Sequence, residues 1–315
     1  MISVCLCVYN GAMYLEQQLQ SIVNQTLLPD EVIIFDDNST DDSYKIINEY
    51  ACKYSKIKWI CRFNNENLGF IENFKNCLAK ASGDLVFLCD QDDIWELDKL
   101  DDSVSIMQRN PQISLLVTNY SIKYEKQSKH NKQNLNNSGT IEHVLSPNAL
   151  TNNYRPGCTF CIRKQLLSLY FLFWDNKYYH DYLLWRLAIV TDAAYLYNKR
   201  CIIWRRHANN ASDYRGGKIT FENFVKRKTR IQNDISWFKR ISNTVSPSWK
   251  NVVKEYFDYL NLRLQLYTSN KVGCWIKLFK YRRFYSTFKS WILDYLLCIK
   301  YKGEEKNDFY NNSNF

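Results

Sequence analysis

The sequence predicts an α/β fold in which helices flank a mostly parallel sheet. Short apolar runs rich in β-branched residues alternate with segments of helical spacing through residues 1–90. The loops between these segments are short and the apolar runs are continuous, as in strands that are buried on both faces. Glycine and proline are scarce, with 9 and 5 residues, which argues against a sandwich of many short strands.

Each strand in the first part of the chain is expected where an apolar run ends at a turn signal. The first run ends at Tyr9-Asn10-Gly11, and Ser39 or Thr40 can cap the helix that follows the second run. The predicted strands are Ile2–Val8, Glu31–Phe35, Ile57–Arg62 and Leu85–Cys89. The predicted helices between them are 14–23, 41–54 and Phe70–Ala81.

The same signals predict further elements up to residue 204. Residues 121–140 are polar and lack periodicity, so we expect a mobile loop or a β-excursion there. The predicted strands are Ile113–Tyr120, Pro156–Ile162, Ala194–Asn198 and Cys201–Trp204. The predicted helices are 163–172 and His180–Val190.

The character of the chain changes near residue 215. Residues 215–306 hold 20 Lys and Arg against 7 Asp and Glu, with helical spacing throughout. We therefore expect a boundary near Tyr214–Gly217. The predicted domains are an α/β domain over 1–214, a basic and aromatic-rich helical extension over 215–302, and a flexible tail over 303–315.

The net charge of +10 is unevenly distributed. Residues 1–110 carry 9 Lys and Arg and 18 Asp and Glu, whereas residues 111–315 carry 33 and 14. The acidic part suits the core of a metal-binding enzyme. The basic part suits a surface that meets an anion, such as a nucleoside diphosphate, a lipid head group or a nucleic acid.

The eleven cysteines are predicted to be reduced, because they lie singly among apolar residues. Cys158 and Cys161 form a C-x-x-C that has no second pair, which argues against a zinc site. The chain starts without a secretory signal, and it contains no apolar stretch of about 18 residues. These features predict a cytoplasmic protein.

Polar residues gather where three predicted strands end. They are Tyr9-Asn10, Asp36-Asp37 and Asp90-Gln91-Asp92. Because the carboxyl ends of parallel strands meet at one edge of a sheet, these residues are expected to form one site. Carboxylates at Asp90 and Asp92 can hold Mg²⁺ or Mn²⁺. The alternative is an acidic cap on a helix that starts near Trp95.

Seven segments, in order along the chain, resemble the family 2 glycosyltransferases of bacteria, which have the GT-A fold. The branch they resemble most contains rhamnosyltransferase-like enzymes of surface-polysaccharide assembly. The segments are VCLCVYNGAMYLEQQLQSIVNQT (4–26), IIFDDNSTDDS (33–43), NENLGFIENF (65–74), ASGDLVFLCDQDDIW (81–95), PGCTFCIRK (156–164), YHDYLLW (179–185) and WRRHANN (204–210).

The resemblance assigns roles to individual residues. It implies a metal at the D-x-D of Asp90 and Asp92, with Asp93 adjacent and His207 as a third ligand. It implies a catalytic base at Asp181, which takes the proton of the acceptor hydroxyl in an inverting transfer. The implied nucleotide-binding residues are Tyr9, Asn10, Asp36, Asp37, Asn67, Gly69, Asp90, Gln91 and Arg206. The implied acceptor-binding residues are Gly157 and His180.

Simpler structural roles stay open for several of these residues. Asp36 can form a turn, Gly69 can be a turn glycine, Asp181 can be an ordinary N-cap, and the strand end at Arg206 can be solvated. Aromatic residues between Trp275 and Leu296 alternate with Lys and Arg. This pattern fits an amphipathic contact with an anionic membrane, on the inner face of the cell membrane, or a helical appendage with a solvated basic face.

The sequence thus predicts an inverting, metal-dependent glycosyltransferase. Its donor would be a nucleoside diphosphate sugar, dTDP-rhamnose by resemblance, with a UDP-hexose or UDP-N-acetylhexosamine as the alternative. Its acceptor would be a growing or polyprenyl-diphosphate-linked surface glycan. A nucleic-acid-binding protein explains only the basic part, because the acidic part would repel phosphates. An inactive family member used as a scaffold is a third interpretation.

Overall fold

The computed structural model describes residues 1–125, 136–207, 218–269 and 272–301. They form two compact units, each considered by itself. The sheet unit comprises the described residues of 1–145 and 153–211, and the helical unit comprises 146–152 and the described residues from Lys218 onward. The predicted boundary at Tyr214–Gly217, the predicted tail at 303–315, and residues 126–135 of the polar segment lie outside the described residues.

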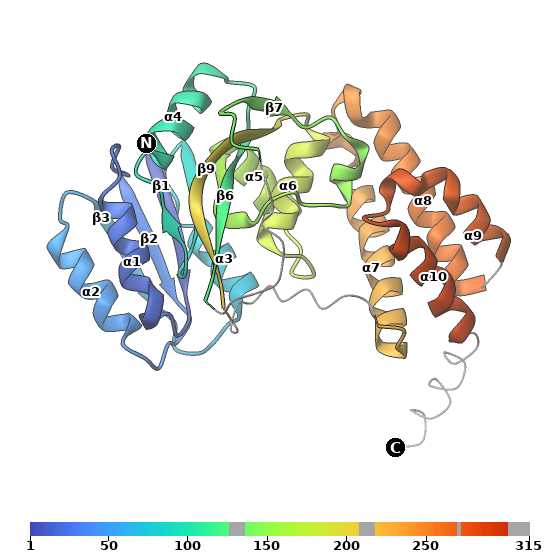
Figure 1. The fold of residues 1–315 in the computed structure, drawn as a ribbon, viewed down its shortest axis with the longest axis horizontal. Coiled ribbons are helices and arrows are strands. Elements are labelled where there is room, and N and C mark those ends of the chain that lie inside the picture. The colour runs from blue at the N-terminus through green and yellow to red at the C-terminus, as the bar shows by residue number, and fades with distance from the viewer. Residues whose placement is uncertain (126–135, 208–217, 270–271, 302–315) are drawn as a thin grey trace. The chain divides into compact units, whose positions relative to one another are not determined.

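The sheet unit is built on one sheet, whose described strands follow the order β3-β2-β1-β4-β8-β6-β9-β5, with β7 paired to β9 (Figure 1). Neighbours are parallel from β3 to β4 and between β6 and β9, and β8 runs antiparallel to both of its neighbours. The strands are β1 (Ile2–Val8), β2 (Glu31–Asp36), β3 (Lys58–Phe63), β4 (Leu85–Asp90), β5 (Ile94–Trp95), β6 (Leu115–Tyr124), β7 (Ile141–His143), β8 (Phe160–Arg163) and β9 (Ala194–Arg206).

The strand register explains why the predicted site residues meet at one edge. Val8 of β1 pairs with Asp36 of β2, and Cys7 of β1 pairs with Asp90 of β4. The residues that follow these three strands therefore leave the sheet side by side. This is the edge at which ligands bind in open α/β sheets.

Both faces of the sheet are covered by helices, as expected for the parallel strands. The helices of the sheet unit are α1 (Ala12–Val23), α2 (Ser43–Lys53), α3 (Phe70–Leu78), α4 (Lys99–Arg109), α5 (Lys164–Phe173) and α6 (His180–Val190). Val4, Leu6 and Val8 of β1 belong to one apolar cluster with buried residues of α1, α2 and α4. Cys5, on the opposite face of β1, contacts Cys77 of α3.

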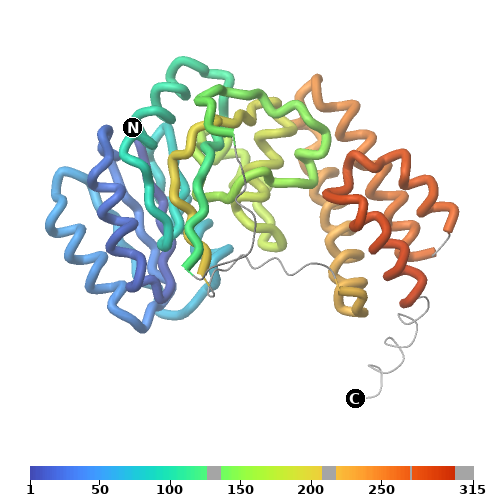
Figure 2. The backbone as a smooth tube through the Cα atoms, in the orientation of Figure 1, coloured from blue at the N-terminus to red at the C-terminus, as the bar shows by residue number. Residues whose placement is uncertain are grey.

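Several predicted bounds are wrong because of contacts between residues far apart in the sequence. Lys199 and Arg200 were expected to separate two strands, but β9 is continuous and runs beside β6, with a shift of the pairing register at this point (Figure 2). Lys199 donates hydrogen bonds to Asp98 and Asp102, and Asn198 accepts one from Arg155. These partners let polar residues remain in the strand.

The segment after β4 also differs from expectation. Ile94–Trp95 forms the short strand β5 against β9, and the next helix, α4, begins at Lys99 rather than near Trp95. Trp95 is buried, and its backbone N–H donates a hydrogen bond to the hydroxyl of Ser21 and is not part of a helix. The carboxylates of Asp90 and Asp92 therefore do not cap a helix that starts at Trp95.

Smaller differences concern the segments on either side of the polar stretch. β6 begins at Leu115 and continues to Tyr124, and Ile141–His143 forms the strand β7. Within the predicted strand Pro156–Ile162, Gly157–Thr159 form a short 3₁₀ helix, η2, before β8. All eleven cysteines lie in the described residues and are free thiols.

The helical unit is held together by one buried carboxylate. Asp294 of α10 accepts hydrogen bonds from Arg227 of α7, Arg263 of α8, Tyr267 of α8 and Tyr285, at 2.6 to 2.9 Å. Burial opposes ionisation of Asp294, but the two arginines keep its pKa below the ordinary value. The helices of this unit are α7 (Phe221–Arg240), α8 (Lys250–Ser269), α9 (Val272–Leu278) and α10 (Phe288–Lys300), with short 3₁₀ turns η1 (Pro147–Leu150), η3 (Ser242–Thr244), η4 (Pro247–Trp249) and η5 (Phe279–Phe284).

Within the described part of the chain, none of the helices combines the length and apolar character that crossing a bilayer requires.

Candidate active site

Asp181 is a buried carboxylate at the first turn of α6. Its Oδ1 accepts a hydrogen bond from the N–H of Tyr182 at 2.7 Å, and its Oδ2 accepts one from Nδ2 of Asn153 at 3.3 Å. Burial raises the pKa of Asp181 to about 6, against the lowering effect of these hydrogen bonds. A carboxylate with a pKa near 6 is still ionised at neutral pH, yet it is a stronger base than an exposed aspartate.

Gly157 allows the chain to approach this carboxylate. A Cβ atom on Gly157 would lie 2.9 Å from Cβ of Asp181 and 3.5 Å from Nε2 of His180. Any side chain at this position would displace one of the two residues. The structure therefore brings Gly157, His180 and Asp181 together.

His180 is buried and its ring stacks on Phe74 of α3, with ring centroids 3.9 Å apart. Burial lowers the pKa of His180 to about 3, so the imidazole is neutral at physiological pH. Its Nδ1 is buried and has no hydrogen-bond partner among the described residues. A neutral imidazole can donate a hydrogen bond to a hydroxyl group or accept one from it, but it cannot supply a positive charge.

A second group of acidic residues lies at the end of β4. Ligand atoms of Asp90, Asp93 and Cys158 lie within 4.8 Å of one another. Burial, followed by the negative charges of Asp92 and Asp181, raises the pKa of Asp90 to about 7. Asp90 and Asp181 are thus close enough to interact electrostatically, although they come from β4 and α6.

Asp92 and His207 form a pair across 115 residues of sequence. Nε2 of His207 lies 2.8 Å from Oδ2 of Asp92, and both side chains are largely buried. The imidazole stacks on Tyr14 of α1, with centroids 4.7 Å apart and planes at 22°. The hydroxyl of Tyr14 in turn donates to the carboxylate of Glu125, which fixes the ring.

The side chains at the end of β4 are of the types that bind a divalent cation, but among the described residues the ligand atoms that lie within 4.8 Å of one another are those of Asp90, Asp93 and Cys158, without Asp92 or His207. Carboxylate oxygens from Asp90 and Asp92 and an imidazole nitrogen from His207 are ligands that Mg²⁺ and Mn²⁺ accept. The raised pKa of Asp90 has repulsion from Asp92 among its causes, and a bound cation would relieve that repulsion. Asp93 is less accessible than Asp92, because it is fully buried and accepts a hydrogen bond from the backbone of Arg205.

Gln91 holds the end of β1 in place. Its Oε1 accepts a hydrogen bond from the N–H of Tyr9 at 2.8 Å, and its Nε2 donates to the carbonyl of Tyr9 at 3.0 Å. A Cβ on Gly11 would lie 2.4 Å from Oε1 of this amide, so a side chain there would displace Gln91 from its hydrogen bonds with Tyr9. The ring of Tyr9 is 49% exposed, and it is therefore available for stacking. Asn10 lies next to it with a positive φ of 48° and binds Thr40 through its side chain.

The two carboxylates after β2 differ in their surroundings. Both oxygens of Asp37 accept hydrogen bonds from the loop before α3, from Asn64, Leu68 and Gly69, at 2.8 to 2.9 Å. Asp36 accepts one from the N–H of Ser39, and its Oδ2 has no partner among the described residues. Oδ2 of Asp36 is thus buried without a hydrogen-bond partner among the described residues, whereas both oxygens of Asp37 bind the loop.

That loop brings Asn67 and Gly69 to the same edge of the sheet. Oδ1 of Asn67 accepts a hydrogen bond from the N–H of Gly69 at 3.0 Å. Gly69 has a φ of 79°, and a Cβ built there would touch nothing. A glycine at this position therefore allows the positive φ of the backbone before α3, and it is not needed for close packing. Arg206, at the end of β9, lies over the ring of Trp204 at 4.6 Å.

Sequence reasoning did not identify the residues that support the site from neighbouring elements. Asn153, Phe74 and Tyr14 contact Asp181, His180 and His207 respectively. Each is an ordinary residue of a loop or a helix, and only the fold places it beside a functional side chain. The position of Tyr14 within the first helical segment gave no signal that would separate it from a core aromatic.

Comparisons with known proteins are consistent with this geometry. A family model described as "Glycosyl transferase family 2" matches residues 3–187. The dTDP-rhamnosyl transferase RfbG of Shigella flexneri is 26% identical over 246 residues, which cover 75% of this chain and 81% of RfbG. The glucosyltransferase WfgD of Escherichia coli, named for UDP-Glc and α-D-GlcNAc-diphosphoundecaprenol, is 28% identical over 199 residues, or 61% and 70% of the two chains.

Solved structures share the fold. The structure of Staphylococcus aureus TarS 1–349 in complex with UDP has a TM-score of 0.57 at 16% identity and covers 86% of this chain and 92% of that one. The mannosyltransferase PcManGT of Pyrobaculum calidifontis, in complex with GDP-Man and Mn²⁺, has a TM-score of 0.54 at 16% identity and covers 96% and 86%.

Proposed function

This chain belongs to glycosyl transferase family 2, and on that premise we propose that it transfers a sugar from a nucleoside diphosphate to an acceptor hydroxyl with inversion. The observation that carries the proposal is the buried carboxylate of Asp181, held by Gly157 and Asn153 within electrostatic reach of Asp90. A base beside an acidic, metal-accepting strand end is what such a transfer requires.

In the proposed reaction Asp181 takes the proton of the acceptor hydroxyl. The hydroxyl oxygen then forms a bond to the anomeric carbon as the bond from that carbon to the diphosphate oxygen breaks, and the diphosphate leaves with the electron pair. Because attack and departure occur on opposite faces, the anomeric configuration inverts. Asn153 and the N–H of Tyr182 orient the base, and the neutral His180 can hold the acceptor.

The donor is proposed to bind at the ends of β1, β2 and β4. Tyr9 would stack on the base, and the open oxygen of Asp36 would accept a hydrogen bond from the base or ribose. Asp37 would act through the loop that carries Asn67 and Gly69. Arg206 would meet the diphosphate. A divalent cation, Mn²⁺ or Mg²⁺, held by Asp90, Asp92 and His207 would supply Lewis-acid neutralisation of that diphosphate.

The favoured donor is dTDP-rhamnose. The support is the likeness to RfbG, named as a dTDP-rhamnosyl transferase, over three quarters of this chain. UDP-glucose or a UDP-N-acetylhexosamine is the alternative, because WfgD is named for UDP-Glc and TarS is solved with UDP-GlcNAc. The acceptor is proposed to be a lipid-linked or growing surface glycan.

We further propose that the helical unit contacts an anionic membrane surface. Residues between Trp275 and Leu296, expected to form a helix, fall in α9, η5 and α10, where Trp275 stacks on Trp291 with ring centroids 4.0 Å apart. Large apolar side chains on these elements remain exposed: Val272, Ile276, Phe279, Phe288, Ile292, Leu296 and Ile299. Apolar side chains beside lysines and arginines are typical of an interfacial contact.

Donor hydrolysis tests the transferase proposal without an identified acceptor. Purified protein is incubated with dTDP-rhamnose, UDP-glucose or UDP-N-acetylglucosamine and Mn²⁺, and the released nucleoside diphosphate is measured. We expect release from one donor, with a freed sugar of inverted configuration by NMR. Asp181→Asn should abolish release, whereas Asp84→Asn, at an exposed ion pair with the N-terminus, should not. Equal rates for both variants would contradict the role of Asp181.

Sedimentation with vesicles tests the membrane proposal separately. We expect binding to phosphatidylglycerol vesicles and none to phosphatidylcholine vesicles. Leu296→Glu on α10 should reduce binding, whereas Leu172→Glu, at an even more exposed position on α5 of the sheet unit, should not. Equal binding by the two variants would contradict a contact through α10.

A further inference from the structure

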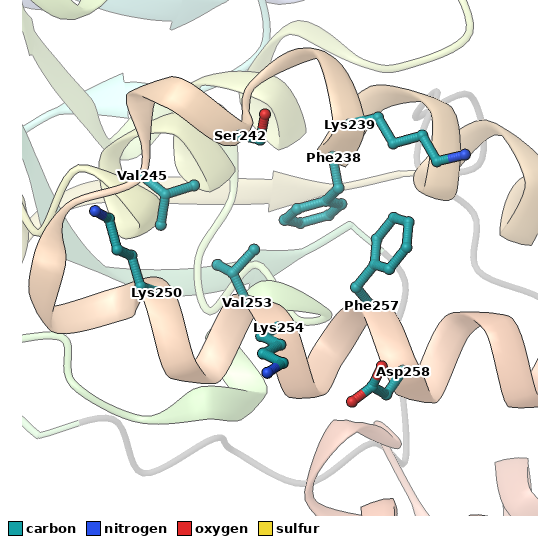
Figure 3. Close-up of a pocket in the computed structure, with 9 residues that line it drawn as sticks. All are labelled: Phe238, Lys239, Ser242, Val245, Lys250, Val253, Lys254, Phe257 and Asp258. Carbon is teal, nitrogen blue, oxygen red and sulfur yellow. The ribbon is translucent and has the colours of Figure 1, made fainter.

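A groove in the helical unit has an apolar floor and a basic rim. It lies between the end of α7 and the first half of α8, with a volume of about 490 Å³. Figure 3 shows Phe238 and Val245 on one side pointing toward Val253 and Phe257 of α8 on the other. Phe238 and Val245 are buried, and Val253 and Phe257 are half-buried. The volume lies in the range of pockets that bind small molecules.

The charged residues at the groove are mostly lysines. Lys239, Lys250 and Lys254 line its edges, and Asp258 is the acidic residue among its lining. All three lysines are exposed, and the ammonium group of Lys239 lies 5.9 Å from the ring centre of Phe257. The positive charges therefore sit directly beside the apolar surface, where they would meet the head of a ligand whose tail lies on the floor.

A second hollow, formed by residues of α8 and η5, is also lined mostly by basic side chains. Lys280, Arg282 and Arg283 line it together with Glu255, which forms an ion pair with Arg283. Summed over both hollows, the lining carries six basic and two acidic residues. Charges of one sign in a concave surface attract ligands of the opposite sign.

We infer that the groove between α7 and α8 binds a single-chain lipid with a phosphate head group. The hydrocarbon chain would lie on Val253 and Phe257, which the buried Phe238 and Val245 support from below, and the phosphate would contact Lys239, Lys250 and Lys254. An uncharged lipid would leave the lysines unused, and a free phosphate would leave the apolar floor exposed to water. The chemistry of the groove matches a ligand with both parts. This inference is independent of the proposed glycosyl transfer.

Calorimetry with alkyl phosphates tests the inference on the full chain. The probes are butyl, hexyl and octyl phosphate below their micelle concentrations, with inorganic phosphate and octyl glucoside as controls. We expect affinity to rise by about fourfold for each added methylene, since burial of a methylene contributes about that factor. We expect binding by inorganic phosphate and by octyl glucoside to be at least about tenfold weaker than by octyl phosphate.

Paired variants locate the binding. Lys250→Gln with Lys254→Gln should weaken the binding of octyl phosphate by about tenfold or more, whereas Lys56→Gln with Lys80→Gln, at exposed positions of the sheet unit, should change it less than twofold. Val253→Glu should abolish binding by placing a negative charge on the floor. Circular dichroism and the thermal midpoint show whether each variant is folded. If Val253→Glu does not fold, Val253→Ser replaces it and should weaken binding.

Three results would overturn the inference. Equal affinity for inorganic and octyl phosphate would mean a plain anion site, and equal affinity for octyl glucoside and octyl phosphate would mean an apolar site without charge recognition. Unchanged binding by both the Lys250/Lys254 variant and the folded Val253 variant would place any lipid site elsewhere. None of these measurements uses a nucleotide or a sugar donor. A negative result for the lipid groove therefore leaves the transferase proposal intact, and a negative result for sugar transfer leaves the lipid groove intact.

Discussion

Gly157 and Asp181 approach so closely that no side chain fits between them. A Cβ on Gly157 would lie 2.9 Å from Cβ of Asp181, a separation that real Cβ atoms do not adopt. The 3₁₀ turn at Gly157 thus sets the position of the carboxylate at the start of α6. A base displaced by an ångström loses much of its effect on the transition state.

Gly157→Ala should lower kcat for donor turnover by about 10- to 100-fold, because Asp181 must move away from the reacting hydroxyl. The KM for the donor should change less than about threefold. Gly273→Ala is the matched control, since a Cβ there meets nothing within 4 Å, and it should leave turnover unchanged. Steady-state kinetics of both variants provide the test. A normal kcat for Gly157→Ala would contradict the claim that Gly157 sets the position of Asp181.

Asp181→Asn should lower kcat by about 10²- to 10⁴-fold, the usual contribution of a general base. In the wild type, activity should fall as pH drops through about 6, because protonation removes the base and its pKa is raised to that value by burial. A pH profile of kcat/KM between pH 5 and 8 is the measurement. A rate that stays constant down to pH 5 would exclude Asp181 as the base.

The same substitution should stabilise the fold at neutral pH. The pKa of Asp181 in the folded protein is above its unfolded value, so its buried charge costs stability above pH 6 and costs none below about pH 4, where it is protonated in both states. Asp181→Asn should therefore raise the free energy of unfolding by about 1–3 kcal/mol at pH 7.5. This gain should vanish at pH 4 in denaturant titrations, and a gain that is independent of pH would argue against a charge effect.

Asp37→Ala should loosen the loop that carries Asn67 and Gly69. The carboxylate accepts three hydrogen bonds from this loop, and its removal leaves buried donors without partners. We expect a loss of about 2–4 kcal/mol of unfolding free energy, together with a donor KM at least about tenfold higher. Asp42→Ala, at an exposed position between β2 and α2, is the control. It should change neither the unfolding free energy nor the donor KM appreciably.

Asp294→Asn should destabilise the helical unit by about 3–5 kcal/mol, because it leaves Arg227 and Arg263 without their buried partner. Tyr267→Phe removes one hydrogen bond from the same carboxylate and should cost about 1 kcal/mol. Urea titrations followed by circular dichroism compare the two variants. Similar losses for both would mean that the charge of Asp294 does not organise the unit.

The sequence predicts the fold class and the family because their signals are local. Ile2–Val8 and His180–Val190 have the predicted bounds, since a continuous apolar run and an apolar segment with helical spacing need no distant partner. The mostly parallel sheet flanked by helices is confirmed, and so is the resemblance to family 2 glycosyltransferases.

The wrong or missing details depend on contacts between distant residues. The strand β5 exists only through pairing with β9, and Asn198–Arg200 stay in β9 because Lys199 reaches Asp98 and Asp102. The pairing of His207 with Asp92 and the stacking of Tyr14 on His207 join three elements. Such contacts follow from the packing of the whole sheet unit, which no spacing of residues encodes.

Equilibrium binding of UDP and dTDP, with Mn²⁺ or with a chelator, is the decisive test of the proposed metal-dependent donor site. We expect one of the nucleotides to bind the wild type at least about tenfold more tightly with Mn²⁺, a difference of about 1.4 kcal/mol. Asp92→Asn, which removes the charge of the residue paired with His207, should bind the nucleotide equally with and without the metal. If neither nucleotide binds the wild type, or if Mn²⁺ leaves its affinity unchanged, the proposed metal-dependent donor site is contradicted.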